Sequence, residues 1–356
     1  MAPLKLRDRD AIITKEGLVF RVFGYSHPSR SFVCDAEYAS SKTFQSNNPK
    51  ALRTGTRKVF YKFYEDEGWK FIQNNFPKYM IPHETLSRKV VGVRWNDIFE
   101  VRIPDLVLQL LMRAPPKDDL LEATQEAIKV ILKSSALHLE DFGVFGSLLH
   151  GFYHPRFSDI DLIIYGRKNL AKLRETVAEL SETDSSRLKN EFETDQAIAD
   201  KNWRFKNMSP EEYTWHQRRK LIYTLFDDPK SGRTIKTEFE PVKDWKEIQN
   251  EYNPTNRIVQ KGWTRLTARV TDDGDGPFIP SVYGIEPLEV VEGPRNAVEA
   301  KRVISYMEEF RAQAYTDETV EVIGNLEEVK TPEGSCLQVA LTYCPRYYEQ
   351  VLKVKI

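Results

Sequence analysis

The feature that most constrains the fold of this chain is a run of alternating apolar and polar segments between residues 141 and 165. Residues 142–145 are apolar and predict a short strand, and Gly146-Ser147 stands where that strand would end. Residues 160–165 predict a second strand, because they form an apolar, β-branched run broken by one acid. The segment therefore predicts a mixed α/β core in the middle of the chain.

Gly146 and Ser147 have the character of a phosphate-binding turn. They follow the first predicted strand and precede a short predicted helix, where backbone N–H groups and the positive end of the helix can hold phosphate oxygens. Gly146 permits close approach of the backbone, and the Ser147 hydroxyl adds a donor. A Gly-Ser pair alone is common, so this prediction depends on the acidic pair that follows it.

Asp159 and Asp161 begin the second predicted strand. Side chains two residues apart lie on the same face of a strand, so both carboxylates point one way while Ile160 and Leu162 point into the core. Two carboxylates this close repel each other unless a cation lies between them or one takes up a proton. Oxygen-only ligands suit Mg²⁺, so the pair predicts a magnesium site.

The segment resembles the DNA polymerase beta-like nucleotidyltransferase superfamily, in particular its minimal nucleotidyltransferase branch, in which G-S-x-x-x-G is followed by S-D-[IV]-D-L. The matching residues are Gly146, Ser147, Gly151, Ser158, Asp159, Asp161 and Leu162. His150 occupies the position before the second glycine, where the family usually has a basic residue. The layout of the whole chain also resembles a group of uncharacterised archaeal nucleotidyltransferases.

The resemblance implies transfer of a nucleoside monophosphate from an NTP such as ATP to an acceptor hydroxyl, with two Mg²⁺ ions and release of pyrophosphate. Asp159 and Asp161 would be catalytic residues that bind both ions. The resemblance also implies a third carboxylate on a neighbouring strand, and the predicted strand 234–242 carries Glu238 and Glu240 on one face. We favour Glu238 as the catalytic acid because it lies in the middle of the strand, whereas Glu240 abuts a proline. Both remain candidate metal ligands.

Basic and hydroxyl side chains near the motif are candidates for holding the triphosphate. Arg156 and Ser158 lie in the loop that enters the acidic strand, and Arg219 lies within the Arg-Arg-Lys run 218–220. Arginine forms forked contacts with phosphate. The predicted nucleotide ligands are therefore Gly146, Ser147, Arg156, Ser158 and Arg219. A run of charges is also typical of a solvated helix face, and this alternative stays open for 218–220.

The fold class that we expect is α+β, with a polymerase-beta-like nucleotidyltransferase core of mixed sheet and helices between two β-rich domains. Residues 1–103 are β-rich, because short β-branched and aromatic segments alternate with turn residues. Residues 104–255 alternate helical and strand-like segments and contain the motif. Residues 256–356 turn β-rich again and predict a small closed barrel.

Four helices are expected in the central domain, at 104–112, 120–137, 168–182 and 210–226. The second shows the clearest signals, because Asp118 is a favourable N-cap and leucine and isoleucine recur at helical spacing. Strands are expected between and after these helices.

Composition narrows the cellular setting. The chain has 356 residues, of which 40% are hydrophobic, and no apolar run reaches the roughly 18 residues of a membrane-spanning helix. The N-terminus is charged from Lys5 onward and lacks the apolar core of a signal peptide. The 3 cysteines form no C-x-x-C pair, so they indicate neither a disulfide framework nor a zinc site. We expect a cytoplasmic protein with no membrane partner.

The acceptor is not identified by the motif, and three hypotheses stay open. RNA, with tRNA as one candidate, is favoured by the aromatic residues at 60–79 and by a basic loop at 40–58. The basic residues of this loop are Lys42, Lys50, Arg53, Arg57 and Lys58. A protein or small-molecule acceptor is favoured by the net charge of −1. The third hypothesis is an RNA-binding protein without catalysis, which the intact acidic pair disfavours.

Overall fold

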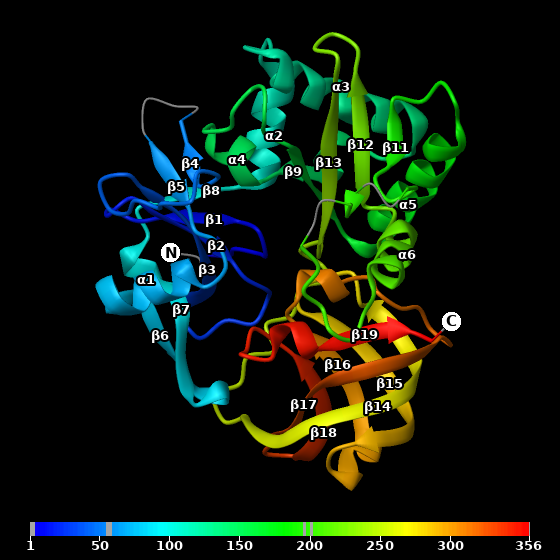
Figure 1. Cartoon of the computed structure of the whole chain (residues 1–356). Helices are drawn as coiled ribbons and strands as arrows, with labels where there is room; N and C mark the ends of the chain where they lie inside the picture. The colour runs from blue at the N-terminus through cyan, green and yellow to red at the C-terminus, as the bar shows by residue number, and fades with distance from the viewer. Residues whose placement is uncertain (1–3, 55–58, 195–196, 200–201, 356) are drawn as a thin grey trace. The chain divides into compact units, whose positions relative to one another are not determined.

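The computed structural model describes residues 4–54, 59–194, 197–199 and 202–355 (Figure 1). The architecture is α+β, as expected, with three sheets that fall within the stretches 1–103, 104–255 and 256–356. The contacts divide the chain into two compact units. Unit 1 comprises Met1–His83, Lys89–Glu191 and Leu221–Tyr252, and unit 2 comprises Glu84–Arg88, Phe192–Lys220 and Asn253–Ile356. The division into three domains at residues 103 and 255 stays a prediction.

The first sheet of unit 1 has eight strands, ordered β4-β5-β3-β2-β1-β8, with β7 paired to β3 and β6 paired to β7. Its strands are β1 (Ala11–Ile13), β2 (Leu18–Val22), β3 (Ser31–Ser40), β4 (Leu52–Arg53), β5 (Phe60–Lys62), β6 (Met80–His83), β7 (Arg88–Arg94) and β8 (Glu100–Arg102). Helix α1 (Glu67–Asn75) buries Ile72 in a core with Phe20 and Val93 of the sheet. The expected β-rich start of the chain is confirmed.

The second sheet of unit 1 has the order β11-β12-β13-β10-β9. Its strands are β9 (Phe142–Val144), β10 (Ile160–Tyr165), β11 (Leu188–Asn190), β12 (Tyr223–Asp228) and β13 (Arg233–Val242). β13 runs parallel to β10 and antiparallel to β12, so it is held from both sides. The helices around this sheet, drawn in teal and green in Figure 1, are α2 (Pro104–Arg113), α3 (Asp119–Ser134), α4 (Gly146–His150) and α5 (Arg167–Glu182).

One face of the second sheet is buried against α3 and α5. Leu162 of β10 and Phe239 of β13 point into this core, together with apolar side chains of both helices. Burying one such side chain stabilises the fold by about 1.5–3 kcal/mol. A slip of one residue would turn the apolar side chains to the other face, so this core fixes the strand register. The opposite face of β10 and β13 therefore receives Asp161 and Glu238.

The predicted helices of the central domain are present, with one correction. Asp118 caps α3 by accepting a hydrogen bond from the Leu121 amide at 3.0 Å. The helix expected at 210–226, however, ends earlier, because α6 is Pro210–Lys220 and β12 begins at residue 223. Leu221 has a φ of 53°, which leaves the helical path. The segment after it pairs with β11 and β13, so tertiary pairing overrides the local helical pattern.

Unit 2 contains the third sheet, whose order is β14-β15-β16-β18-β17-β19. Its strands are β14 (Arg257–Asp275), β15 (Ser281–Glu292), β16 (Ala300–Ser305), β17 (Thr319–Thr331), β18 (Gly334–Leu341) and β19 (Val351–Val354). Val270, Tyr283 and Leu326 are among the side chains of its core. β14 also pairs with β17, so the hydrogen-bonded path returns to its first strand. The expected barrel itself stays a prediction.

Two further features concern the helices and the cysteines. Among the described residues, no helix combines the length and the apolar character needed to cross a membrane. Cys34, Cys336 and Cys344 are free thiols, and Cys34 is buried.

Candidate active site

The acids expected from the sequence meet at the start of β10 and in the middle of β13. Asp159 immediately precedes β10, and Asp161 is the second residue of that strand. The parallel register places Glu238 opposite Asp161 and Glu240 opposite Ile163. Paired residues point to the same face of a sheet, so Asp161 and Glu238 are direct neighbours across the two strands.

Glu240 takes part in a different contact. Its carboxylate accepts a hydrogen bond from the Arg9 guanidinium at 2.7 Å, and the two side chains are only 5% and 1% exposed. The Arg9 guanidinium also lies 3.6 Å from the buried Asp8 carboxylate. Loss of Glu240 would remove the shorter of these two contacts, so the pair helps to hold β13 in place. The register and this pairing both favour Glu238 as the third acid, whose catalytic role stays a prediction.

The two aspartates bind protons more tightly than free aspartic acid does. Burial and the carboxylates of Glu238 and Asp159 raise the pKa of Asp161 to about 8. Burial also raises the pKa of Asp159, with the Lys236 ammonium opposing this change and Glu238 adding to it. Raised pKa values in neighbouring acids mean that negative charge is concentrated there. A cation is therefore favoured at this face of the sheet.

The turn between β9 and α4 places Gly146 directly against this acid cluster. Gly146 has a φ of 60°, a left-handed conformation that favours glycine, and a β-carbon at this position would overlap the Asp161 carboxylate. The Phe145 amide donates to the Asp161 carbonyl at 3.0 Å. Ser147 follows in α4 and is buried. The structure therefore brings the Gly-Ser turn and Asp161 into contact.

The loop between α4 and β10 carries the other two candidates, Arg156 and Ser158. The Ser158 hydroxyl accepts a hydrogen bond from the His154 amide at 2.8 Å, so this side chain shapes the loop. The Arg233 guanidinium donates to the carbonyls of Pro155 at 2.8 Å and Ser158 at 3.4 Å. These contacts fix the loop that leads into the acidic strand, while Arg156 itself is exposed.

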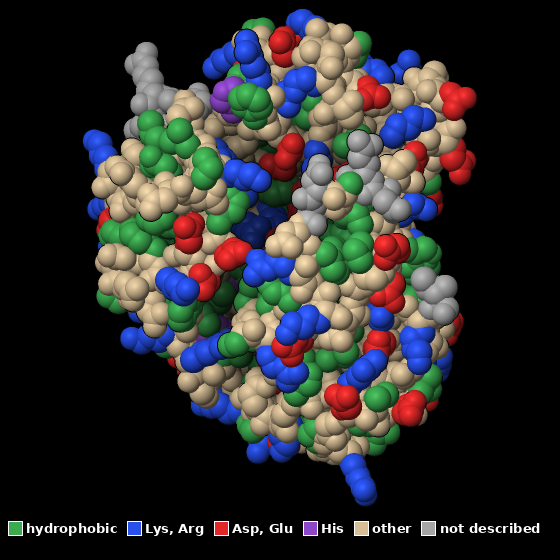
Figure 2. All heavy atoms as spheres, viewed as in Figure 1, with side chains coloured by type: hydrophobic (Ala, Val, Ile, Leu, Met, Phe, Trp, Pro, Cys, Tyr) green, Lys and Arg blue, Asp and Glu red, His purple; other side chains and the backbone are tan. Residues whose placement is uncertain are grey.

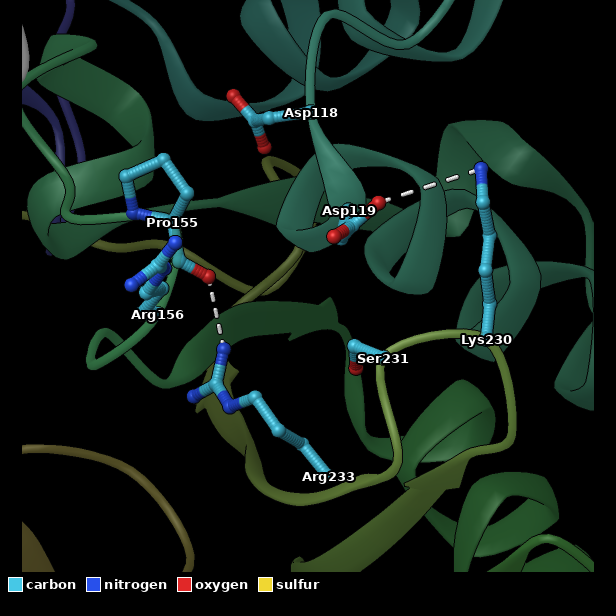
Figure 3. Close-up of a pocket in the computed structure, with 7 residues that line it drawn as sticks. All are labelled: Asp118, Asp119, Pro155, Arg156, Lys230, Ser231 and Arg233. Atoms are coloured by element: carbon cyan, nitrogen blue, oxygen red, sulfur yellow. Dashed lines mark hydrogen bonds and ion pairs between the residues drawn. The ribbon is translucent and has the colours of Figure 1, made fainter.

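A pocket of about 500 Å³ opens beside this loop (Figure 3). It is lined by Asp118, Asp119, Pro155, Arg156, Lys230, Ser231 and Arg233. In Figure 3, Arg233 points to the Pro155 carbonyl, and Lys230 faces Asp119 at 4.0 Å. Strand alternation puts Arg233 on the helix-covered face of β13, with Ile235, whereas the acids lie on the other face. The residues that line the pocket include none of the acids, although the Arg233 charge lowers the pKa of Asp159.

His150 stands where the motif usually has a basic residue, and the structure makes it a packing residue. Its ring stacks on Phe152 with centroids 5.0 Å apart and lies 5.5 Å from the Tyr38 ring. Arg102 Nη1 lies 3.2 Å from its Nδ1 and donates to its carbonyl at 3.1 Å. Burial and the Arg102 charge lower the pKa of His150 to about 3. The ring is therefore neutral at pH 7 and supplies no cation for phosphate.

Two basic residues beside the acids were missed in the sequence. The Lys236 ammonium lies 2.6 Å from a Glu238 carboxylate oxygen. The charge of Lys62, at the end of β5, lowers the pKa of both aspartates. Lys236 could have been found, because it lies two residues before Glu238 on the same face of one strand. Lys62 could not, because only long-range packing brings the first sheet to the acids.

Arg219 lies on α6 in unit 2 and makes its contacts there. Its guanidinium forms an ion pair with Glu318 and lies over the rings of Trp215, at 4.2 Å, and Tyr315, at 4.7 Å. These contacts account for the position of the Arg219 side chain. Phosphate binding by Arg219 stays a prediction.

The acids match Mg²⁺ in the chemistry of their ligand atoms. All their donors are carboxylate oxygens, the ligand type that Mg²⁺ prefers. Within the part of the chain that the structure describes, no three His, Cys, Asp or Glu side chains are placed so that they could already hold a metal ion. Glu238 is bound to Lys236 instead. The acids can therefore surround an ion only when Glu238 leaves or shares that contact.

Comparison with known proteins agrees with the resemblance of the motif. Residues 126–216 match the family described as "Nucleotidyltransferase domain", a stretch that includes the Gly-Ser turn and both aspartates but ends before β13. An uncharacterized protein of Methanocaldococcus jannaschii is 27% identical over 339 residues, which cover 93% of each chain. No solved structure matches this chain. The resemblance of the central region to nucleotidyltransferases is confirmed.

Proposed function

We propose that the nucleotidyltransferase domain at residues 126–216, completed by β13, transfers a nucleoside monophosphate from an NTP to an acceptor hydroxyl. The acceptor oxygen would form a bond to the α-phosphorus, the bond to the β-phosphate oxygen would break, and pyrophosphate would leave. One observation carries the proposal: the register of β10 and β13 sets Glu238 beside Asp161, and Gly146 of the Gly-Ser turn touches the same carboxylate.

Each residue of the site has a role in this reaction. Asp159, Asp161 and Glu238 would hold two Mg²⁺ ions, and Glu238 would also take up the proton of the acceptor hydroxyl. Mg²⁺, when bound, would neutralise the triphosphate and favour ionisation of that hydroxyl. Gly146 and Ser147 would hold the β- and γ-phosphates through backbone N–H groups and the serine hydroxyl. Catalysis would then depend on positioning and charge neutralisation.

The reaction is tested with α-labelled NTPs, Mg²⁺ and cell extract depleted of the native protein. Asp161→Asn should lower transfer by about 10²–10³-fold, the loss typical of removing one group that stabilises transition-state charge. Asp227→Asn, an exposed acid on β12 of the same sheet, is the matched control and should leave transfer unchanged. Transfer by Asp161→Asn at the unaltered rate would contradict the mechanism.

RNA is the acceptor that we favour, and the basic loop at 40–58 is its main support. Lys50 and Arg53 lie in the described part of this loop, and Arg53 donates to the Lys50 carbonyl at 2.7 Å. Arg57 and Lys58 lie outside the described residues. The aromatic residues at 60–79 give less support than expected, because several of their rings pack on one another. These rings are Phe63, Phe71, Phe76 and Tyr79.

A protein or small molecule is the second candidate acceptor. Figure 2 shows basic and acidic side chains interspersed on the visible face of the molecule, and the net charge is −1. An extended single-sign surface would be expected if phosphate contacts dominated binding. This observation favours an acceptor that is recognised by local contacts.

The position of the label after incubation decides between these acceptors. Label in the RNA fraction supports the first candidate, and label in the protein or small-molecule fraction supports the second. RNA affinity should also fall steeply between low and moderate salt if several phosphates are contacted. RNA binding without transfer of any label would identify the protein as a non-catalytic RNA binder.

We also propose a cytoplasmic location, which the three free cysteines support. Fractionation of the source cells, followed by detection of the protein in each fraction, tests this location.

A further inference from the structure

On the face of β13 that carries Glu238 and Glu240, Lys236 is the one basic residue. It lies on β13 two residues before Glu238, and its ammonium is 2.6 Å from one Glu238 carboxylate oxygen. A second carboxylate, that of Glu191 just after β11, lies 3.6 Å from the same ammonium. Lys236 is 33% exposed and Glu191 only 9%, so the second contact is the better shielded one.

The contacts of Lys236 give it two carboxylate partners with different surroundings. Glu238 faces Asp161 across the β10–β13 pair, whereas Glu191 follows the outermost strand of the same sheet. A lysine ammonium is charged at neutral pH, and both carboxylates lie close enough to attract it. A divalent cation that binds Glu238 repels this ammonium, and Glu191 is then the partner that remains.

We propose that Lys236 is an internal counter-ion, which holds Glu238 in the metal-free protein and moves to Glu191 when a divalent cation binds the acids. This inference rests on the proposed function, because it assumes that the acids bind a metal ion. Lys236 is in this sense a positioning residue: it acts on the site through Glu238. It offsets the charge of Glu238 between turnovers and competes with the metal ion for this one ligand.

The proposal predicts effects of opposite sign at the two contacts. Lys236→Met should tighten binding of Mn²⁺, a stand-in for Mg²⁺ at carboxylate sites, by about tenfold, because the competing charge is gone. Glu191→Gln should weaken Mn²⁺ binding, because the displaced ammonium loses its second partner. In the double variant the effect of Glu191→Gln should vanish, since Lys236 is no longer there to move.

Mn²⁺ titration of the full chain without nucleotide, followed by electron paramagnetic resonance, measures these affinities. Lys261→Met is the matched control, because Lys261 and its partner Glu328 are 35% and 20% exposed, close to the 33% and 21% of Lys236 and Glu238. That pair lies in unit 2, 3.2 Å apart, and its removal should not change Mn²⁺ binding. Lys236→Arg keeps the charge and should retain the wild-type affinity.

The outcomes separate this inference from the proposed function. If wild-type protein binds no Mn²⁺ at millimolar concentration, the proposed function fails. If wild type binds Mn²⁺, Asp161→Asn does not, and Lys236→Met binds no more tightly than wild type, the inference alone fails. If Lys236→Met does not fold, judged by circular dichroism, Lys236→Gln is titrated in its place with the same expectation. If Glu191→Gln still weakens Mn²⁺ binding when Lys236 has been replaced by methionine, the charge of Glu191 acts on the ion directly. That result would overturn the proposal that Lys236 moves from Glu238 to Glu191.

Discussion

Replacing Asp161 by asparagine should stabilise the metal-free protein at neutral and alkaline pH, although it should lower nucleotide transfer by about 10²–10³-fold. Burial and the carboxylates of Glu238 and Asp159 raise the pKa of Asp161 from 3.8 to about 8 in the folded protein. Between these two values the folded protein holds a proton that the unfolded chain has already lost. The free energy of unfolding therefore falls as the pH rises through this window.

The structure sets the size of this effect. Each pH unit inside the window lowers the free energy of unfolding by about 1.4 kcal/mol, which gives an upper limit of about 4 kcal/mol at pH 7. An effective dielectric constant of about 20, rather than that of a dry interior, reduces the penalty, and we expect about 2 kcal/mol. Asparagine does not ionise, so the variant avoids this loss. The corresponding rise in Tm is roughly 4–8 °C for a folding unit of 150–250 residues.

Thermal unfolding in EDTA, followed by circular dichroism at several pH values, measures the difference. The stabilities of wild type and Asp161→Asn should nearly coincide at about pH 4 and should diverge up to about pH 8. Excess Mg²⁺ should then stabilise wild type, by about 2.7 kcal/mol at one hundred times Kd, but not the variant. A difference that does not change with pH would refute the argument, as would a variant that is less stable than wild type throughout.

Three further predictions concern the neighbours of Asp161. Glu238→Gln should lower kcat by about 10²–10³-fold in a pyrophosphate-release assay. Glu240→Gln should keep most of the activity but lower the free energy of unfolding, measured in urea, by about 1–3 kcal/mol, because Arg9 loses its shorter carboxylate contact and keeps Asp8 at 3.6 Å. Equal loss of activity in both variants would contradict this assignment. Gly146→Ala should lower the free energy of unfolding by about 1–3 kcal/mol, because the φ of residue 146 is 60°. It should also weaken metal binding, because the new methyl group would displace the Asp161 carboxylate. Unchanged Mn²⁺ affinity would argue against the contact between residue 146 and Asp161. Lys62→Met should weaken NTP binding without changing the fold, because it removes a positive charge beside the aspartates. Calorimetry with a non-hydrolysable NTP measures the Kd. An unchanged Kd would show that Lys62 does not contribute to NTP binding.

Local signals account for the parts of the structure that the sequence could predict. The central helices were predictable because Asp118 caps α3 and apolar residues recur at helical spacing. The proximity of Asp159 and Asp161 follows from strand alternation alone. The choice of Glu238 over Glu240 needed more, because both lie on one face of β13, and only the register with β10 and the contact with Arg9 distinguish them.

Contacts between distant segments account for what the sequence could not predict. The helix expected at 210–226 included residues 223–226, but the pairing of this segment with β11 and β13 makes it part of a strand. His150 was expected at the position of a basic residue, and its stacking on Phe152 and its contact with Arg102 depend on packing across unit 1. Lys62 reaches the acids from the first sheet for the same reason. None of these contacts leaves a periodic pattern along the chain.

The ion pair of Arg9 and Glu240 also constrains how the protein can be made. The two residues are 231 positions apart, and Arg7 pairs with Asp105 across 98 positions. At the usual rate of synthesis, roughly 5–20 residues per second, Arg9 leaves the ribosome about 10–50 s before its partner. The N-terminal segment is thus among the first parts made, but its contact with β13 can form only after residue 240 has been made. Since β13 carries both Glu240 and Glu238, a nascent chain holds an incomplete acid cluster until this late strand arrives, and nucleotide transfer would begin only then.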